Sequence, residues 1–507
     1  MISGIATSQK TKEYSEKFPE LTFQDLGTTG LWVSQAGFGS YRVDVQSDSH
    51  RKALRKALRS GVNLIDTSAN YTDGNSEELI GETLQELIQT KELLRESVVI
   101  VSKVGYLQGQ NYELSQKRKL AGKAFPDLVI YADGLEHCIH PEFIEDQLTR
   151  SLIRLRMKSL DVYLLHNPEY FLEWAHKNGT PLEKARSEYY RRIEAAFRHL
   201  EEEVKRGRIQ FYGVSSNTFP VGAREFAFTS LEEIWNIAEK ISSNHHFRVI
   251  QFPMNLFETG AATCQNQRRS LTVLEFAREK NLGILINRPL NAFSGNEMIR
   301  LAEVREINHE GDADVSIHKI RDLEVIFKKE LLPTLKLSNS ERKEIAEAAA
   351  LGETLAQFTP RIRSYYHWLD IESQYFAPTA NQLVEILLKA EGLERRVSDW
   401  LSAYLSNLNE LFLAMRVRFS EDLRKRMKQI KSEVAALDPD WQNVPTLSQL
   451  AIRALRSTSG ITCVLVGMRQ EAYVDDVLME LRQKIVVQDR LESWNALLNN
   501  RAFSSVK

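Results

Sequence analysis

Short runs of apolar and β-branched residues alternate along this chain with longer stretches whose apolar residues recur at helical spacing. A polar residue or a glycine follows each run, namely Gly39, Asp66, Ser102-Lys103, His166, Ser215, Gln251, Asn287 and Gly467. The runs occupy residues 35–38, 62–65, 98–101, 162–165, 209–214, 247–250, 282–286 and 463–466. This alternation is typical of parallel strands connected by helices.

The intervening stretches predict helices over residues 49–60, 76–88, 141–155, 183–207, 230–241, 270–280 and 446–458. Eight strands with helices between them predict an α/β fold, a (β/α)8 TIM barrel, whose active site lies at the carboxyl ends of the strands. The competing fold is an open doubly wound sheet, which would carry a Gly-x-Gly-x-x-Gly turn after its first strand. Only Gly37-Phe-Gly39 is present, and position 42 is Arg42, so the barrel is favoured.

Residues 291–445 interrupt the alternation and predict an inserted all-helical subdomain. Residues 301–445 contain three of the chain's 24 glycines, which indicates few turns and strands. Ser338-x-x-Glu341 and Thr379-x-x-Gln382 have the spacing of a helix capping box, as does Thr446-x-x-Gln449 beyond the insertion. We expect Pro333, Pro360, Pro378 and Pro439 to lie between helices. The predicted division is an N-terminal extension (1–20), a barrel (21–290 and 446–507) and the helical insertion (291–445).

The composition limits the classes of function. The 507 residues carry 66 basic and 68 acidic side chains, so no net field attracts nucleic acid or an anionic membrane. No apolar run approaches the roughly 20 residues that span a bilayer. Three cysteines cannot form a disulfide framework and favour the cytoplasm. His137-Cys-Ile-His140 has metal-ligating residue types but lacks a second cluster, so we predict no metal site.

Five motifs resemble successive signatures of the aldo-keto reductases. They are LGTTGLWVSQAGFGSYR (26–42), GVNLIDTSANYTDGNSEELIGETL (61–84), VVIVSKVG (98–105), SLIRLRMKSLDVYLLHNPE (151–169) and GRIQFYGVSSNTF (207–219). The resemblance covers about residues 21–290, resumes over about 446–478 and omits the insertion. It implies an NAD(P)-dependent oxidoreductase that interconverts a carbonyl and an alcohol.

The resemblance places the family's catalytic tetrad at Asp66, Tyr71, Lys103 and His166. Carbonyl reduction needs a proton donor for the developing alkoxide, and a tyrosine hydroxyl serves better when a nearby ammonium lowers its pKa. Tyr71 would be the general acid in reduction and the base in oxidation. Lys103 would lower the pKa of Tyr71, Asp66 would neutralise Lys103, and His166 would orient the carbonyl oxygen.

The resemblance also implies contacts with a nicotinamide cofactor, for which we expect NADP(H) rather than NAD(H). The expected cofactor residues are Gly39, Ser40, Tyr41, Asp66, Ser215, Ser216, Gln251, Asn287, Arg288, Leu290, Gly467 and Arg469. Ser216 stands where the family usually has asparagine, and Asn287 replaces the aromatic residue that stacks on the nicotinamide ring. Arg469 would contact the 2′-phosphate of NADP, although a pairing with Asp475 or Asp476 is an alternative.

The substrate would be a small aldehyde, ketone or sugar, bound near Tyr41, Tyr71, His166 and Trp174. The aromatic residues of the loop after His166, among them Tyr170 and Trp174, would either line a pocket or pack within the loop. A second hypothesis is a redox-sensing or scaffolding protein that binds the cofactor and contacts a partner through residues 292–445. Self-association through the same residues is a third.

Overall fold

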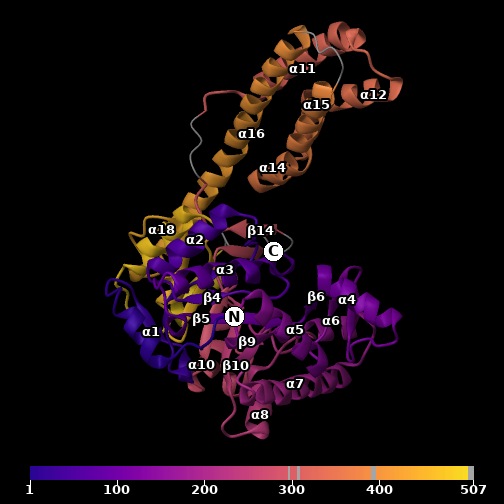
Figure 1. The fold of residues 1–507 in the computed structure, drawn as a ribbon. Helices are drawn as coiled ribbons and strands as arrows, with labels where there is room; N and C mark the ends of the chain where they lie inside the picture. The colour runs from indigo at the N-terminus through magenta and orange to yellow at the C-terminus, as the bar shows by residue number, and fades with distance from the viewer. Residues whose placement is uncertain (295–296, 305–308, 390–394, 501–507) are drawn as a thin grey trace. The chain divides into compact units, whose positions relative to one another are not determined.

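The computed structural model describes residues 1–294, 297–304, 309–389 and 395–500. These residues form two compact units, one made of residues 1–302 and 431–507 and the other of residues 303–430. The first unit contains a closed barrel of eight parallel strands, as the sequence predicts (Figure 1). In order around the barrel they are β3 (Ala36–Gly39), β4 (Leu64–Asp66), β5 (Val99–Val104), β9 (Leu160–His166), β10 (Ile209–Ser215), β11 (Phe247–Pro253), β12 (Gly283–Asn287) and β15 (Cys463–Gly467).

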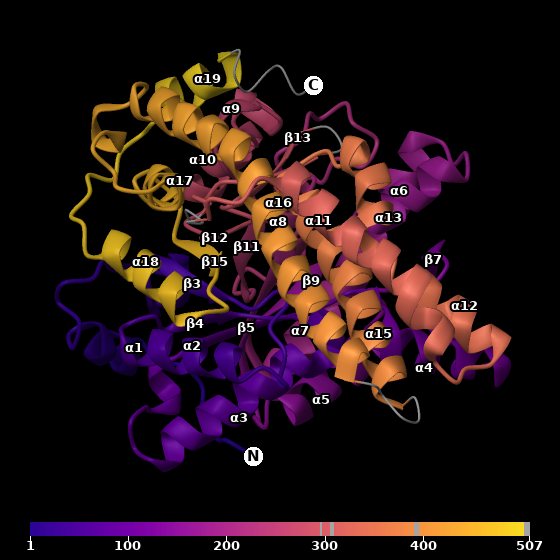
Figure 2. The same ribbon diagram turned by 90° about the horizontal axis from the view of Figure 1, so that it is seen from above.

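Helices surround these strands (Figure 2). They are α2 (Asp48–Arg59), α3 (Asn75–Gln89), α5 (Pro141–Arg154), α7 (Leu182–Lys205), α8 (Leu231–Ile241), α10 (Val273–Glu279), α17 (Leu447–Arg456) and α18 (Glu471–Leu481). Side-chain caps fix several of their starts: the Ser47 hydroxyl caps α2 and the Ser230 hydroxyl caps α8. The apolar faces of these helices pack on the strands, which explains the helical spacing of their leucines and alanines.

The barrel register aligns the polar residues at the strand ends. Gly39 pairs with Asp66, and Ser215 pairs with both His166 and Gln251. Because parallel strands place these residues at the same end of the barrel, side chains far apart in sequence meet there.

The opposite end of the barrel is closed by the N-terminal residues. A hairpin of β1 (Phe23–Asp25) and β2 (Trp32–Ser34) contributes Leu26, Leu31 and Val33 to the apolar cluster inside the barrel. The helix α1 (Ser8–Ser15) is tied to the barrel wall because Tyr14 donates a 2.5 Å hydrogen bond to the carbonyl of Leu58. Residues 1–20 thus pack as part of the first unit.

Several helices and strands of the first unit do not belong to the alternation of strands and helices that forms the barrel. Between β5 and α5 the chain forms α4 (Gly109–Leu120) and a three-stranded sheet of β6 (Tyr106–Leu107), β7 (Val129–Ala132) and β8 (Leu135–His137). The short helices α6 (Tyr170–Lys177) and α9 (Gly260–Thr263) follow β9 and β11, and α19 (Leu491–Asn499) lies near the C-terminus.

The segment that follows β12 differs from our prediction. Residues 291–300, expected to be helical, contain an antiparallel hairpin of β13 (Asn291–Ser294) and β14 (Glu297–Arg300). The backbone N–H of Leu301 donates to the carbonyl of Leu290 at 2.9 Å, which extends this hairpin pairing by one step.

The second unit is helical. It contains α11 (Ala313–Ile326), α12 (Asn339–Ala348), α13 (Leu351–Phe358), α14 (Tyr365–Ile371), α15 (Ala377–Lys389) and most of α16 (Arg395–Ala435). Its core is a separate apolar cluster that includes Phe327, Trp368, Phe376, Trp400 and Tyr404. None of the helices in the described ranges is long and apolar enough to cross a membrane.

Two of the expected helix boundaries are wrong. Ser338 and Glu341 form the predicted capping box of α12, but Thr379 lies inside a helical stretch, where its hydroxyl donates to the carbonyl of Tyr375. Pro378 lies in the same stretch, directly after a π-helical turn over Glu372–Phe376. A π-turn leaves a backbone carbonyl without its usual N–H partner. Pro378 has no N–H to donate, so it can follow the π-turn and the helix continues through it.

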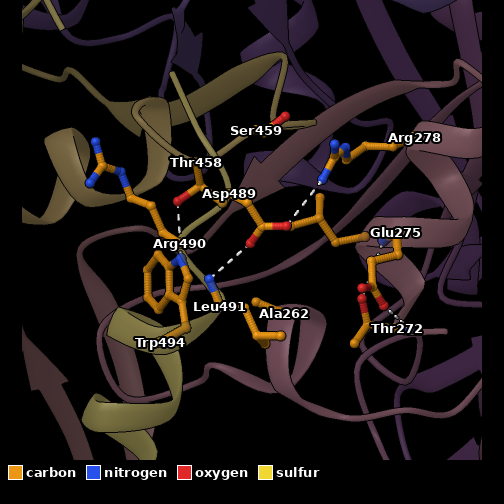
Figure 3. Close-up of a pocket in the computed structure, with 11 residues that line it drawn as sticks. Ala262, Thr272, Glu275, Arg278, Thr458, Ser459, Asp489, Arg490, Leu491 and Trp494 are labelled. Atoms are coloured by element: carbon orange, nitrogen blue, oxygen red, sulfur yellow. Dashed lines mark hydrogen bonds and ion pairs between the residues drawn. The ribbon is translucent and has the colours of Figure 1, made fainter. Parts of the chain in front are cut away.

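Within the first unit, a buried arginine binds the C-terminal residues to the segment that follows α16. Arg490 is 2% exposed and donates to Asp438 and Asp440, each at 2.6 Å. Figure 3 shows Arg490 beside Trp494, whose indole N–H donates to the hydroxyl of Thr458, and beside the exposed pair of Arg278 with Asp489. The cavity between these residues has a volume of about 20 Å³, room for a water molecule and not for a cofactor.

Replacing Arg490 by methionine should therefore lower the free energy of unfolding by about 3 kcal/mol, because the buried charge of Asp438 would lose its only cationic partner among the described residues. The matched control is Arg278→Met, which removes an ion pair of 3.8 Å between exposed side chains and should cost about 1 kcal/mol or less. Urea unfolding of both variants gives the comparison. Equal losses would show that Arg490 is not the anchor.

Candidate functional site

The four tetrad residues lie together at the carboxyl ends of neighbouring strands. Asp66 ends β4, Lys103 lies in β5 and His166 ends β9. Tyr71 begins a 3-10 turn (Tyr71–Gly74) just after β4. Two residues of this turn, Thr72 and Asp73, have φ values of 50° and 54°, a conformation that non-glycine residues rarely adopt. The strand register thus supplies three members, and a tight turn supplies the fourth.

Lys103 lies at the centre of the group. Its side chain is 0% exposed, and its ammonium donates to Asp66 Oδ2 at 2.7 Å, to the carbonyl of Thr67 at 2.8 Å and to Tyr71 Oη at 3.1 Å. All three N–H groups of the ammonium are therefore used. This geometry joins the carboxylate and the phenol through one buried cation.

A second chain of hydrogen bonds reaches Asp66 from the opposite side. Gln251 Nε2 donates to Asp66 Oδ1 at 2.7 Å. Gln251 Oε1 accepts from the hydroxyl of Ser215 at 3.1 Å and from the amide of Asn287 at 3.3 Å. Both oxygens of Asp66 are thus engaged, and Gln251 connects two further expected cofactor residues, Ser215 and Asn287, to the tetrad.

Burial dominates the electrostatics of the group. The pKa of Tyr71 is raised by burial, and the charge of Lys103 opposes this effect without overcoming it. Lys103 thus acts on the pKa of Tyr71 in the predicted direction, but desolvation of the phenolate is the larger effect, so the pKa lies above its ordinary value. The pKa of Lys103 is raised: burial acts against its charge, but Asp66 and Tyr71 outweigh that penalty.

The pKa of Asp66 is also set by burial acting against its hydrogen-bond partners. Burial raises the pKa of Asp66, while Lys103 and Gln251 act to lower it. We regard the pair as ionised, since the ammonium has three acceptors and the carboxylate has two donors at 2.7 Å.

His166 is held as a neutral imidazole. Burial, followed by the charge of Lys103, lowers its pKa well below the ordinary value. Its Nδ1 lies 3.1 Å from the hydroxyl of Ser68, and its ring contacts Tyr106 and Tyr71 edge-on at centroid distances of 4.7 and 6.0 Å. A neutral, fixed imidazole is suited to hydrogen-bonding a substrate oxygen.

His137, which we weighed as a metal ligand, instead supports the backbone of His166. Its Nε2 bonds the carbonyl of His166 at 2.7 Å, and burial lowers the pKa of His137 to about 4. A Cβ atom at Gly105 would lie 2.4 Å from that carbonyl, so only glycine permits the approach. His140 caps α5 by accepting from the N–H of Glu142, and no group of three or more metal-ligating side chains occurs in the described ranges.

The expected residues after β3 border the tetrad. Ser40 is buried, and its hydroxyl donates to the carbonyl of Asp66 at 2.8 Å. Tyr41 is 60% exposed and lies edge-on to Tyr71 at 5.3 Å, so its ring stands at the opening of the site. Gly39 pairs with Asp66 in the barrel and with Gly467, which is exposed at the end of β15.

The other expected residues are engaged within the protein. The hydroxyl of Ser216 bonds Thr218 and Thr229, and the guanidinium of Arg288 pairs with Glu258 at 2.7 Å. The ring of Trp174 packs against Phe171, with their centroids 6.0 Å apart.

A cluster of positive charge surrounds Arg469. Burial, then the neighbouring charges of Arg300 and Arg42, lowers the pKa of Arg469. The alternative partners that we named for Arg469 are engaged elsewhere: Asp475 pairs with Lys56, and Asp476 accepts from Ser448 and Gln449. Like charges gathered in a half-buried place are suited to an anion such as a phosphate.

Sequence reasoning missed several residues of the site. Tyr106 and Arg300 lie in the sheet after β5 and in the hairpin after β12, which have no counterpart in the strand alternation. Glu169 is buried, its Oε1 accepts from the N–H of Asn217 at 2.8 Å, and burial raises its pKa to about 7. For Ser68 and Glu169 the sequence offered one signal, which is that each lies within three residues of a tetrad member.

The site fits a nicotinamide nucleotide. The buried Oδ1 of Asn287 lacks a hydrogen-bond partner among the described residues, and it lies beside Gln251 and Ser215, so it is available to a carboxamide N–H. The Arg469 cluster, at the end of the adjacent strand β15, provides a place for a phosphate. The chain thus offers an amide-binding group and an anion-binding group on neighbouring strands.

Comparison with known proteins identifies the family. The model of the aldo/keto reductase family matches residues 35–338, which is more than half of the chain. The chain therefore belongs to the aldo/keto reductase family.

Two of its curated relatives are a reductase and a dehydrogenase. It is 30% identical over 149 residues to the NADH-specific methylglyoxal reductase of Escherichia coli, a match that covers 28% of this chain and 40% of that protein. It is 29% identical over 130 residues to the L-galactose dehydrogenase of Arabidopsis thaliana, covering 24% of this chain and 40% of the relative. The chain thus spans less than half the length of these relatives.

Among solved structures, an aldo-keto reductase from Bacillus halodurans in its holo form covers 94% of this chain and 95% of its own, with 14% identity and a TM-score of 0.45. An aldo/keto reductase from Klebsiella pneumoniae in complex with NADP and acetate covers 52% of this chain and 67% of its own, with 19% identity and a TM-score of 0.32.

The buried His137 should make the protein sensitive to acid. Its pKa is about 4 in the folded state against 6.5 when solvated, so the unfolded state binds a proton first as pH falls below 6.5. Stability should fall by about 1.4 kcal/mol per pH unit between pH 6.5 and 4 through this residue alone. His137→Gln, whose amide can still donate to the His166 carbonyl, should reduce that slope. Urea unfolding of the wild type and the variant at pH 5 and pH 7.5 measures this pH dependence of stability. If the pH dependence is the same in His137→Gln as in the wild type, His137 is not its source.

Proposed function

We propose that this protein is an NADP(H)-dependent oxidoreductase that interconverts the carbonyl of a small aldehyde, ketone or sugar and the corresponding alcohol. The observation that carries the proposal is the buried Lys103 ammonium, which bonds both Asp66 and Tyr71 Oη. Family membership supports the same reaction class. The three cysteines, none of them in a disulfide, support a reducing compartment such as the cytoplasm.

Tyr71 is the proton donor in reduction and the acceptor in oxidation. Since Lys103 already donates to Tyr71 Oη, the phenolic hydrogen of Tyr71 is free to point at a substrate oxygen. Burial keeps the phenol protonated at neutral pH, and the adjacent ammonium stabilises the phenolate that forms when the proton leaves. Asp66 and Gln251 hold that ammonium in place.

A bound nicotinamide supplies or accepts the hydride. Ser215, Gln251 and Asn287 would hold its carboxamide, with Asn287 offering a hydrogen bond where an aromatic residue would offer stacking. Arg469, with Arg300 and Arg42 beside it, would hold the 2′-phosphate that distinguishes NADP from NAD. His166 would hydrogen-bond the substrate oxygen from a neutral ring.

The role of Tyr71 as the proton donor can be tested by removing its phenolic oxygen. Tyr71→Phe should lower kcat/KM by about a hundredfold to ten-thousandfold, because the proton donor is lost, while NADPH binding is retained. The assay follows NADPH and NADH oxidation with methylglyoxal and D-xylose, and nucleotide binding is followed by fluorescence. Tyr375→Phe, at an exposed tyrosine of the second unit, is the matched control. Nucleotide binding without turnover of any carbonyl by the wild type would favour the redox-sensing alternative.

The nucleotide preference can be tested at Arg469. Arg469→Met should raise the Kd for NADPH by about tenfold to a hundredfold, the value of a charge-assisted hydrogen bond, and change the Kd for NADH by less than about threefold. Arg150→Met, which removes an exposed arginine from α5, is the control. Equal weakening of both nucleotides would contradict a 2′-phosphate contact. Calorimetric titration gives both constants.

A further inference from the structure

The turn that carries Tyr71 has a strained backbone. The two residues that follow Tyr71 lie in the left-handed region, Thr72 at φ 50° and ψ 40° and Asp73 at φ 54° and ψ 37°. Thr72 is the more strained, because a β-branched side chain crowds the backbone there, whereas aspartate adopts this region several times more often. Contacts outside the turn must therefore compensate for the strain.

Thr72 itself makes such a contact. Its hydroxyl donates to the carbonyl of Val43 at 2.7 Å. Val43 is 0% exposed and lies in the loop between β3 and α2, which also carries Ser40 and Tyr41. The bond thus ties the turn that bears the phenol to the loop that bears two of the expected cofactor residues.

Two other contacts hold the far end of the turn. Asp73 Oδ1 accepts from the backbone N–H of Gln110, in the first turn of α4, at 3.1 Å. Gly74 lies against Arg154, so closely that a Cβ atom on this glycine would be 2.8 Å from Arg154 Cδ. The far end is therefore fixed by α4 and α5.

The bond of Thr72 is the contact next to the phenol. Tyr71 directly precedes Thr72, and its Oη lies 3.1 Å from Lys103 Nζ. That distance is near the upper limit of an ordinary hydrogen bond, so a displacement of about 1 Å would break it. The backbone at Thr72 thus decides whether the phenol meets the ammonium.

We infer that Thr72 is a positioning residue, whose hydroxyl, bonded to the Val43 carbonyl, holds the left-handed turn and so keeps the Tyr71 phenol against the Lys103 ammonium. The consequence for turnover rests on the proposed function, whereas the position of Tyr71 does not.

Three variants separate the hydroxyl from the strain. Thr72→Val keeps the shape and the crowding but places a methyl group, instead of a donor, at the Val43 carbonyl. Thr72→Ser keeps the hydroxyl. Thr72→Gly removes the hydroxyl and the strain together, and it leaves room for water at the carbonyl. The matched control is Thr354→Val in α13 of the second unit, where a threonine hydroxyl donates to the carbonyl of Ala350 at 2.8 Å.

The experiment is ¹⁹F NMR of the full chain labelled with 3-fluorotyrosine, titrated between pH 6 and pH 11 without nucleotide or substrate. The Tyr71 signal is assigned by its absence in Tyr71→Phe. Burial raises the pKa of Tyr71 by more than Lys103 lowers it, so a phenol released into water should titrate earlier. We expect the midpoint in Thr72→Val to lie at least about one pH unit below that of the wild type. Thr72→Ser, Thr72→Gly and Thr354→Val should keep the wild-type midpoint.

An unchanged midpoint in Thr72→Val, or an equal fall in Thr72→Ser or Thr72→Gly, would overturn the inference. If Thr72→Val does not fold, Thr72→Ala replaces it, because alanine also lacks the hydroxyl and keeps a Cβ atom in the left-handed region. Its midpoint should fall by a smaller amount, and no fall would overturn the inference.

Turnover gives a second measurement. In Thr72→Val, kcat should fall by about tenfold to a hundredfold, because the proton donor is misplaced, while the Kd for NADPH changes by less than about threefold. A loss confined to NADPH binding would contradict the positioning role. If the wild type turns over no carbonyl, the proposed function fails, and the titration still decides the position of Tyr71.

Discussion

A positive charge enclosed by the barrel is the constraint on which the site depends. The Lys103 ammonium has no access to water and must find all its partners within the protein, because an unpaired buried ion costs several kcal/mol. Asp66, the Thr67 carbonyl and Tyr71 supply them. Each partner is fixed by another element: Gln251 holds Asp66, and the turn after β4 holds Tyr71. The need to satisfy one cation therefore positions the residues of three strands and a turn.

The features that repeat along the chain could be predicted from the sequence. Each of the eight strand runs is followed by a polar residue or a glycine, and the parallel register brings those residues together as expected. Features that depend on partners distant in sequence could not. Thr379 has the spacing of a cap, yet a π-turn before Pro378 continues the helix through it. The balance between burial and Lys103 at Tyr71 depends on solvent exclusion, which no residue pattern reports.

The departures from the repeating pattern add to the site. The sheet after β5 brings Tyr106 against the ring of His166 and His137 against its carbonyl. The hairpin after β12 brings Arg300 near Arg469, immediately before the chain enters the second unit at residue 303. Additions to a barrel at the carboxyl ends of its strands alter the groups around a bound ligand while the strands stay in register.

The hydrogen bond between Gln251 and Asp66 joins residues 185 positions apart, and the pairing of Val464 with Ala36 closes the barrel across nearly the whole chain. During synthesis the first strands emerge long before β15, so an incomplete barrel holds Lys103 and Asp66 without Arg469. Non-local contacts of this kind form late in folding. A nucleotide that needs both ends of the sequence would bind the closed barrel alone. Its binding would then draw the folding equilibrium toward closure.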